Sequence, residues 1–302
     1  MSDISRIGGW KRKSFSKVKF YDKALWKNSL FWLGVISAAI TVVSFFADAG
    51  GLRIELPRWS IGILILGFLC MWWKANHEKE VELHINKTKV VIKQGDIFEL
   101  MERPVDERHE EISIIAANDC FDTIVDDRIV ASKTLHGQYV KRIEKAGKLA
   151  ALNEAISNDE IINREGNRAK TSKRHKGKSI RYSIGSVVEF ESYVLAAFTT
   201  FDAKNKASVS AEEYTGFWMK FWENIDEIYA GRTINFPLIG AGITRFKNGK
   251  PTKQELLEIM LWSMKISGFH NTYNDRQINI LIHESDMKEI DLYHIKHNQS
   301  FR

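Results

Sequence analysis

Hydrophobic and polar residues are distributed very unevenly along this chain. Two nearly continuous apolar runs occupy residues 29–46 and 59–73, and neither contains a charged side chain. A helix needs about 20 predominantly apolar residues to cross the roughly 30 Å of hydrocarbon in a bilayer. Each run therefore predicts a transmembrane helix, although the shorter second run spans only if its flanks contribute or the bilayer thins. The alternative is a pair of helices buried in a protein core.

The flanks of the two runs favour a membrane hairpin over residues 29–73. Six of the nine tryptophans precede the soluble part of the chain, mostly at the run ends, as in the aromatic belts of membrane interfaces. Residues 1–28 form a basic arm with eight Lys/Arg and two Asp, whereas the connection 47–58 contains two arginines. The positive-inside rule therefore keeps both termini and the remainder of the chain in the cytoplasm.

Local features of the hairpin region leave alternatives open. Ala47-Asp48-Ala49 resembles a signal-peptidase site, but the second apolar run follows at once, which favours a retained anchor. Gly50, Gly51 and Pro57 predict that the connection between the runs is a short loop. The basic arm has apolar residues at helical spacing, so it either lies on an anionic leaflet or is a solvated tail.

From residue 79 to residue 302 the pattern becomes that of an α/β domain. Alternation or short apolar runs predict strands at 81–86, 90–93, 111–118, 186–190, 193–199, 233–236 and 278–282. Helical spacing and start signals predict helices at 128–157, bent near Gly137, after the capping boxes at Ser210 and Thr252, and at 285–297. Gly268 is the predicted stop signal of the helix that begins at Thr252. Strands that alternate with helices predict a three-layer α/β/α domain with a mixed, mostly parallel sheet.

Composition adds three limits to this picture. The formal net charge is +6, and the basic arm accounts for the excess, so the main domain is close to neutral and nucleic-acid binding is not expected. The two cysteines, Cys70 and Cys120, predict no disulfide framework and fit a reducing compartment. Neither a zinc-ligand spacing nor another metal or cofactor motif is expected. Residues 157–183 are polar and basic, which predicts a surface insertion that is either solvated or in contact with lipid head groups or a partner.

A glycine loop follows the strand that begins at Thr233. Gly240 and Gly242 flank Ala241, and Ile239 and Ile243 complete the loop. Glycines let the backbone take positive φ and approach a ligand closely, with amide N–H groups pointing into the bend. The pattern is compatible both with a diphosphate site and with a tight turn that binds nothing.

Other strand ends also bear polar residues. Asp96 and Ile97 follow the second predicted strand, and a carboxylate there can accept from an exocyclic amine. Ala117 and Asn118 end the third strand, where a small residue leaves space for a ligand and the amide offers both a donor and an acceptor. Phe201, at a further strand end, is a candidate wall of the pocket.

In their order and spacing, these strand ends resemble those of the macro domain, an α/β/α fold that binds ADP-ribose. The resemblance covers about residues 80–300. It implies that Asp96 receives the adenine amino group, that Ile97 lines the adenine site and that Asn118 lies beside the distal ribose. The loop Ile239–Ile243 would then hold the diphosphate through backbone amides.

One departure bears on catalysis. Macro domains that hydrolyse ADP-ribose linkages usually have a glycine-rich run soon after the asparagine, whereas residues 119–127 contain no glycine. No other catalytic arrangement replaces that run, so the sequence predicts a binder without catalytic residues. The alternative is a membrane-tethered enzyme that removes ADP-ribose from proteins or metabolites.

A membrane hairpin followed by a variant macro domain is similar to the membrane effector of Thoeris-type bacterial antiphage defence. In that family a partner TIR-domain enzyme converts NAD into an ADP-ribose-derived signal. The resemblance implies a multi-pass protein of the bacterial inner membrane whose cytoplasmic macro domain binds the signal. It also implies that binding leads to homo-oligomeric assembly and membrane disruption.

Overall fold

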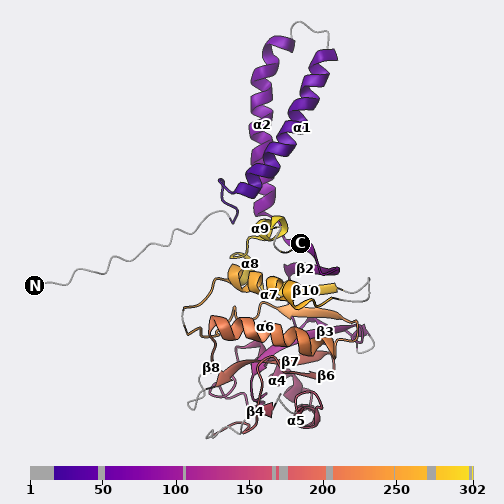
Figure 1. Ribbon diagram of the computed structural model, residues 1–302, viewed down its shortest axis with the longest axis vertical. Coiled ribbons are helices and arrows are strands. Elements are labelled where there is room, and N and C mark those ends of the chain that lie inside the picture. The colour runs from indigo at the N-terminus through magenta and orange to yellow at the C-terminus, as the bar shows by residue number, and fades with distance from the viewer. Residues whose placement is uncertain are drawn as a thin grey trace, which may run out of the picture. The chain divides into compact units, whose positions relative to one another are not determined.

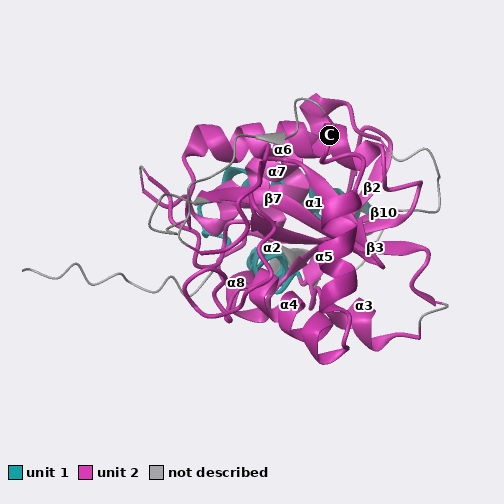
Figure 2. Cartoon of the chain, turned by 90° about the horizontal axis from the view of Figure 1, so that it is seen from below, with its two compact units in different colours: residues 1–78 teal, residues 79–302 magenta. Residues whose placement is uncertain are grey.

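The computed structural model describes residues 17–46, 52–104, 107–164, 168–169, 176–201, 207–247, 249–270, 277–298 and 301 (Figure 1). The chain divides into two compact units, Met1–Glu78 and Lys79–Arg302, which Figure 2 colours separately.

The first unit is a pair of helices, α1 (Lys23–Phe46) and α2 (Leu52–Asn76), that pack against each other. Both are longer than the apolar runs that predict them. The expected connecting loop is wrong in its second half, because residues 52–58, Pro57 included, are helical and belong to α2. The first half of that connection, with Gly50 and Gly51, lies outside the described residues.

Apolar side chains of the hairpin, among them Phe31, Trp32 and Leu66, are exposed. Among the described residues, Lys23–Val42 of α1 is long and apolar enough to cross a membrane, whereas the apolar part of α2, Ile61–Asn76, is shorter. Length and composition thus support one spanning helix and leave the second as a prediction.

The second unit is built on a mixed sheet of eight strands in the order β1-β2-β10-β9-β3-β7-β6, with β8 paired to β7. Strands β2, β10, β9, β3 and β7 are mutually parallel, and β1, β6 and β8 are antiparallel to their neighbours. The bounds are β1 (Glu80–Ile85), β2 (Thr88–Gln94), β3 (Glu111–Asn118), β6 (Val187–Phe190), β7 (Tyr193–Phe201), β8 (Ala207–Ser208), β9 (Thr233–Pro237) and β10 (Gln277–Ile282). The predicted mostly parallel sheet is confirmed.

Helices cover both faces of this sheet, because successive side chains of each strand point to opposite sides. Ile112 and Ile114 of β3 enter one apolar core, which α6 (Ala211–Asp226) and α7 (Lys253–Ser267) close. Ile115 and Ala117 enter a second core against α3 (Glu99–Glu102), α4 (Leu135–Lys145) and α5 (Leu149–Asn158). The three-layer fold is thereby confirmed.

Local start and stop signals are confirmed where they were predicted. Ser210 and Thr252 form complete capping boxes at the starts of α6 and α7, and Gly268 ends α7 in the left-handed conformation. The aromatic face of α6 is core, with Trp218 and Trp222 buried. These signals are local in sequence, so long-range packing does not override them.

Two predicted helices are wrong in extent. Residues 128–134 are irregular, and the helix expected over 128–157 is divided into α4 and α5 at Gly147, whose φ is +72°. There is no break at Gly137, which lies inside α4. The closing helix is also two pieces, α8 (Glu284–Met287) and α9 (Leu292–His297). Residues 165–167 and 170–175 of the basic insertion 157–183 lie outside the described residues, and β4 (Arg168–Ala169) and β5 (Arg181–Tyr182) pair within it.

Candidate functional site

A cavity of about 520 Å³ lies where the carboxyl ends of β3, β7 and β9 meet the start of α4. Because these strands are parallel, their carboxyl ends share one edge of the sheet. The predicted site residues Ala117, Asn118, Ile239, Gly240, Gly242 and Ile243 all line this cavity. The fold therefore brings together one strand end and the glycine loop, which are far apart in the sequence.

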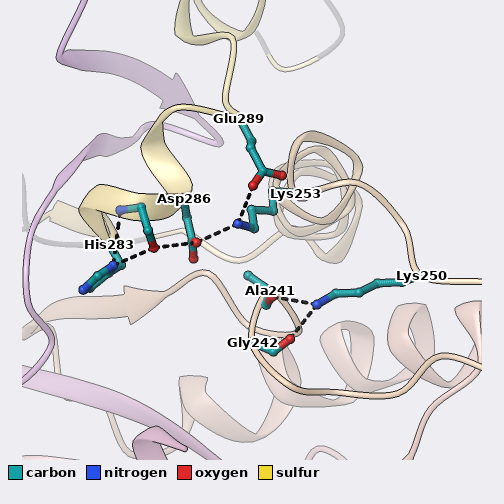
Figure 3. A network of polar contacts seen from close by, with 8 residues as sticks. Ala241, Gly242, Lys250, Lys253, His283, Asp286 and Glu289 are labelled. Carbon is teal, nitrogen blue, oxygen red and sulfur yellow. Dashed lines mark hydrogen bonds and ion pairs between the residues drawn. The ribbon is translucent and has the colours of Figure 1, made fainter. Parts of the chain in front are cut away.

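The carbonyl groups of the glycine loop are held from outside the cavity. The buried Tyr214 hydroxyl donates to the Ile239 carbonyl at 3.0 Å. The Lys250 ammonium donates to the carbonyls of Ala241 at 2.7 Å and Gly242 at 2.5 Å (Figure 3). Three carbonyls of one short loop are thereby engaged by side chains from α6 and from the segment before α7.

The positions of these carbonyls fix the directions of three amide groups. In a trans peptide, the C=O of one residue and the N–H of the next point in opposite directions. The N–H groups of Gly240, Gly242 and Ile243 thus point away from Tyr214 and Lys250, and all three residues line the cavity. A concave set of backbone N–H groups is an anion-binding arrangement.

Glycine is required at one of the two loop positions for a definite reason. Gly240 has a φ of +86°, and a Cβ there would lie 3.2 Å from the Tyr214 ring. A side chain would combine left-handed backbone strain with a clash against a buried ring. Gly242 has open space at the same point, which keeps that side of the loop accessible to a ligand.

Beyond the loop, Lys253 anchors the start of α7. Its ammonium donates to Asp286 of α8 at 2.7 Å and to Glu289 at 2.8 Å, and the Ser285 hydroxyl donates to Asp286 in turn (Figure 3). Together with the Thr252 cap, these bonds hold the segment that positions Lys250. The glycine loop is therefore supported by a framework that exists without a ligand.

Asn118 is oriented by its own strand end. The register between β3 and β7 shifts between Ala117 and Asn118, and such irregularities re-aim side chains. The Asn118 Oδ1 atom accepts from the N–H groups of Cys120 at 3.0 Å and Asp122 at 3.2 Å. Its Nδ2 atom is buried and has no hydrogen-bond partner among the described residues. A buried unpaired donor is costly, so this amide is poised to donate to a ligand in the cavity.

Residues 119–134 form a segment that we call the acidic loop, and most of its residues from Asp127 to Thr134 line the cavity. Asp127 has a φ of +59°, and its carboxylate accepts from the Ser132 N–H at 2.7 Å, which lowers its pKa. The Asp126 carboxylate accepts from the N–H groups of Arg128 and Ile129, and Lys176 donates to it. Short-range bonds of this kind fold the loop on itself.

The acidic loop and the segment after the glycine loop contribute three cations to the cavity lining, Arg128, Lys133 and Arg245. None of the three was predicted from the sequence, and Arg128 and Lys133 were missed because residues 128–134 were expected to form a helix. The available signal was Thr134, which caps α4 by accepting from the Gly137 N–H at 3.0 Å. Gly137 packs its backbone against Ala131, where a Cβ would lie 2.2 Å from the carbonyl oxygen.

His136 also lines the cavity and is buried. Burial, together with the positive charge of Lys178, lowers its pKa to about 4, so the imidazole is neutral at pH 7. Burial lowers the pKa of Lys178 to about 8. Within the described part of the chain, no group of His, Cys, Asp or Glu side chains is arranged to hold a metal ion.

The remaining predicted site residues lie elsewhere. Asp96 and Ile97 line a separate polar cavity of about 370 Å³, and the Asp96 carboxylate accepts from the Phe98 N–H at 3.0 Å. Ala241 is buried within the glycine loop. Phe201 ends β7, and its side chain is not among those that the structure describes. Phe198 and Thr199 of the same strand line the cavity.

The sheet order, the glycine loop and the strand-end asparagine fit an α/β domain of the macro type. Residues 90–283 match the family model described as Thoeris protein ThsA, Macro domain. Over 294 residues the chain is 31% identical to the Thoeris protein ThsA of Bacillus amyloliquefaciens (strain Y2), covering 97% of this chain and 95% of the relative. The chain therefore belongs to the Thoeris ThsA family and is a Thoeris defence effector with a macro domain.

A solved structure of a mutant macrodomain from Oceanobacillus iheyensis is also similar. It is 15% identical, with a TM-score of 0.42, and the match covers 73% of this chain and 93% of that one.

Proposed function

We propose that this effector is a membrane-anchored receptor that binds an ADP-ribose-derived nucleotide in the cavity between the glycine and acidic loops. The supporting observation is that Gly240, Gly242, Ile243 and Asn118 line one cavity, while Tyr214 and Lys250 hold the loop carbonyls and the Asn118 Nδ2 atom has no hydrogen-bond partner among the described residues. A diphosphate with an adjoining ribose supplies acceptors for both sets of donors. Arg128, Lys133 and Arg245 offset the charge of the diphosphate.

Within this proposal, the diphosphate binds the N–H groups of Gly240, Gly242 and Ile243, and the distal ribose accepts from Asn118. Asp96 and Ile97, which the macro-domain resemblance assigns to the adenine, line the separate polar cavity, so a nucleotide whose base they receive must span both cavities. The ligand is the product of a partner TIR-domain enzyme that cleaves NAD.

We propose that the cavity binds its nucleotide without cleaving it. Gly137, the first glycine after Asn118, is absent from the cavity lining, because it packs against the Ala131 carbonyl inside the fold. The acidic loop fills the region beside the distal ribose with bulkier residues. The alternative is that the protein is a hydrolase. In that case the full chain would cleave ADP-ribosylated proteins or metabolites, and chromatography would detect the released ADP-ribose.

The hairpin supplies the membrane response. Its exposed apolar side chains need a nonpolar surrounding, which we assign to the bacterial inner membrane, with the macro domain in the cytoplasm. A ligand can drive a switch only if it binds one assembly better than another. We therefore propose that the liganded protein forms homo-oligomers that disrupt the membrane.

Thermal unfolding of the full chain in detergent tests the binding step. A ligand that binds only the folded protein raises its Tm, and the rise grows with ligand concentration. We expect ADP-ribose to raise the Tm and to be recovered intact, and ribose alone to have no effect. Equal Tm values with and without saturating ADP-ribose would refute the site.

A further inference from the structure

The turn before α1 is fastened to the last turns of α2. The Val18 N–H donates to Asn76 Oδ1 at 2.9 Å, and the Val18 carbonyl accepts from Trp72 Nε1 at 2.9 Å. Asn76 Nδ2 donates to the same carbonyl at 3.4 Å, and Val18 is only 1% exposed. Over its described residues, from Lys17 onward, the basic arm is therefore a docked segment and not a solvated tail.

Aromatic rings close around this attachment. The Phe20 ring lies 5.0 Å from that of Phe68 and 6.0 Å from that of Trp72, in edge-to-face geometry. Trp26 lies 4.6 Å from Phe68, and its Nε1 atom donates to the Phe20 carbonyl at 2.9 Å. We call these residues, with Val18 and Asn76, the aromatic clasp.

Lysines surround the aromatic clasp at the same end of the hairpin. Lys19 and Lys23 are exposed on the turn and the start of α1, and Lys27 and Lys74 are exposed on the adjoining helical turns. Tyr21 lies between the first two and is 73% exposed. The surface thus combines exposed aromatic area with positive charge and is continuous with the apolar side chains of α1.

We infer that the aromatic clasp and its lysines bind anionic phospholipids of the leaflet that faces the cytoplasm. Rings with one polar end suit the membrane interface, and lysine ammonium groups suit the phosphates beside it. Continuity with an apolar helix favours lipid over nucleic acid or an acidic protein as the occupant. The inference rests on the hairpin being in a membrane, which the proposed function includes, but it does not depend on the nucleotide site.

Docking of the turn at Val18 onto α2 should increase the selectivity of the protein for anionic lipid. A free basic arm would lose conformational freedom whenever it met the leaflet, whereas the hydrogen bonds of Val18 hold Lys19 at the end of α2 beforehand. Each lysine near an anionic surface increases association by roughly fivefold. Removing two lysines should lower the preference for anionic lipid strongly, and releasing the docked turn should lower it without any change of charge.

The full chain, reconstituted in phosphatidylcholine vesicles, is titrated with spin-labelled phosphatidylglycerol or phosphatidylcholine, and electron spin resonance gives their relative association. We expect preference for phosphatidylglycerol that falls about 25-fold in Lys19→Gln/Lys23→Gln and falls with added salt. The matched control is Lys141→Gln/Lys145→Gln, which removes two exposed lysines of α4.

Trp72→Phe keeps a ring but removes the donor to Val18, so it tests the docked turn at constant charge. We expect a smaller loss of preference, about twofold, and faster hydrogen exchange at the Val18 amide. Equal association of both lipids with the unmodified chain, an equal loss in the control variant or failure to enter vesicles would overturn the inference. Tm shifts with ADP-ribose should be the same in all these variants, which separates this test from that of the nucleotide site.

Discussion

The two loops that enclose the cavity are stabilised in opposite ways. The glycine loop is held through its carbonyls by Tyr214 and Lys250, and its residues Gly240, Gly242 and Ile243 line the cavity. The acidic loop is folded by its own carboxylates, and it contributes the side chains of Arg128 and Lys133. A site of this kind has one rigid wall that recognises geometry and one charged wall that responds to ionic strength.

The largest effect is expected from breaking the rigid wall. Gly240→Val forces a β-branched residue to a φ of +86° against the Tyr214 ring, so the loop must move. We expect affinity for ADP-ribose to fall about a hundredfold, measured by calorimetric titration. Gly147→Val, at a φ of +72° with no atom near its Cβ, should lower the Tm and leave the affinity unchanged. Equal losses of affinity in both variants would contradict a local role for Gly240.

Asn118→Asp should have the next largest effect. The aspartate retains an oxygen that accepts from the Cys120 and Asp122 N–H groups, but it replaces the free Nδ2 donor with a negative charge. Affinity should fall about thirtyfold, and the buried charge should also lower the Tm without ligand. Unchanged affinity in this variant would show that the ribose does not bind Asn118.

The charged wall is tested by Arg128→Gln/Lys133→Gln. We expect affinity to fall about tenfold at low salt and the difference from the unmodified chain to shrink as salt is added. The glycine-loop variant should lose affinity to the same degree at every salt concentration. Identical salt dependence in the two variants would contradict the proposal that one wall binds the ligand through charge and the other through backbone geometry.

Lys250→Met removes the donor that holds two carbonyls of the glycine loop. Affinity should fall about fivefold, because the amides lose their fixed direction while the loop keeps its attachment to Tyr214. Lys247→Met, which removes an ion pair with Glu213 in the same segment, serves as the matched control. A similar loss in the control would mean that the charge of this segment, and not the loop geometry, matters.

The smallest effect concerns His136, which follows the acidic loop. Its pKa is lowered to about 4 in the folded protein, so the unfolded chain binds the extra proton first as the pH falls. The free energy of unfolding should drop by about 1 kcal/mol between pH 7 and pH 5.5 through this group. Denaturant titrations of His136→Gln should show a correspondingly weaker dependence, and an identical pH profile would refute burial as the cause.

The same contrast explains what the sequence could predict. The strands, the capping boxes and the glycine loop can be predicted from local periodicity and from residues with special backbone preferences. Ser210, Thr252 and Gly268 were therefore predicted correctly. The macro-type fold followed from the order of strand ends, because parallel strands bring those ends to one edge.

The charged wall could not be predicted in this way. Residues 128–134 have apolar spacing compatible with a helix, but bonds of the Asp126 and Asp127 carboxylates to nearby N–H groups, together with backbone bonds such as Val130 N–H to the Ile124 carbonyl, hold them in an irregular loop. Tyr214 acts on the loop from 25 residues away in the sequence, and the Lys250 ammonium reaches back eight and nine residues to carbonyls that no side-chain pattern marks. Asp96 was predicted from its strand end but lines a different cavity. How far a strand end lies from the glycine loop depends on packing, which the sequence does not show.

The most direct test is calorimetric titration of the full chain in detergent with ADP-ribose, beside Asn118→Asp and with chromatography of the recovered nucleotide. We predict saturable binding at one site per chain, about thirtyfold weaker binding in the variant and intact ADP-ribose at the end. No heat of binding, equal affinity in both proteins or cleavage of the nucleotide would contradict a receptor at this cavity.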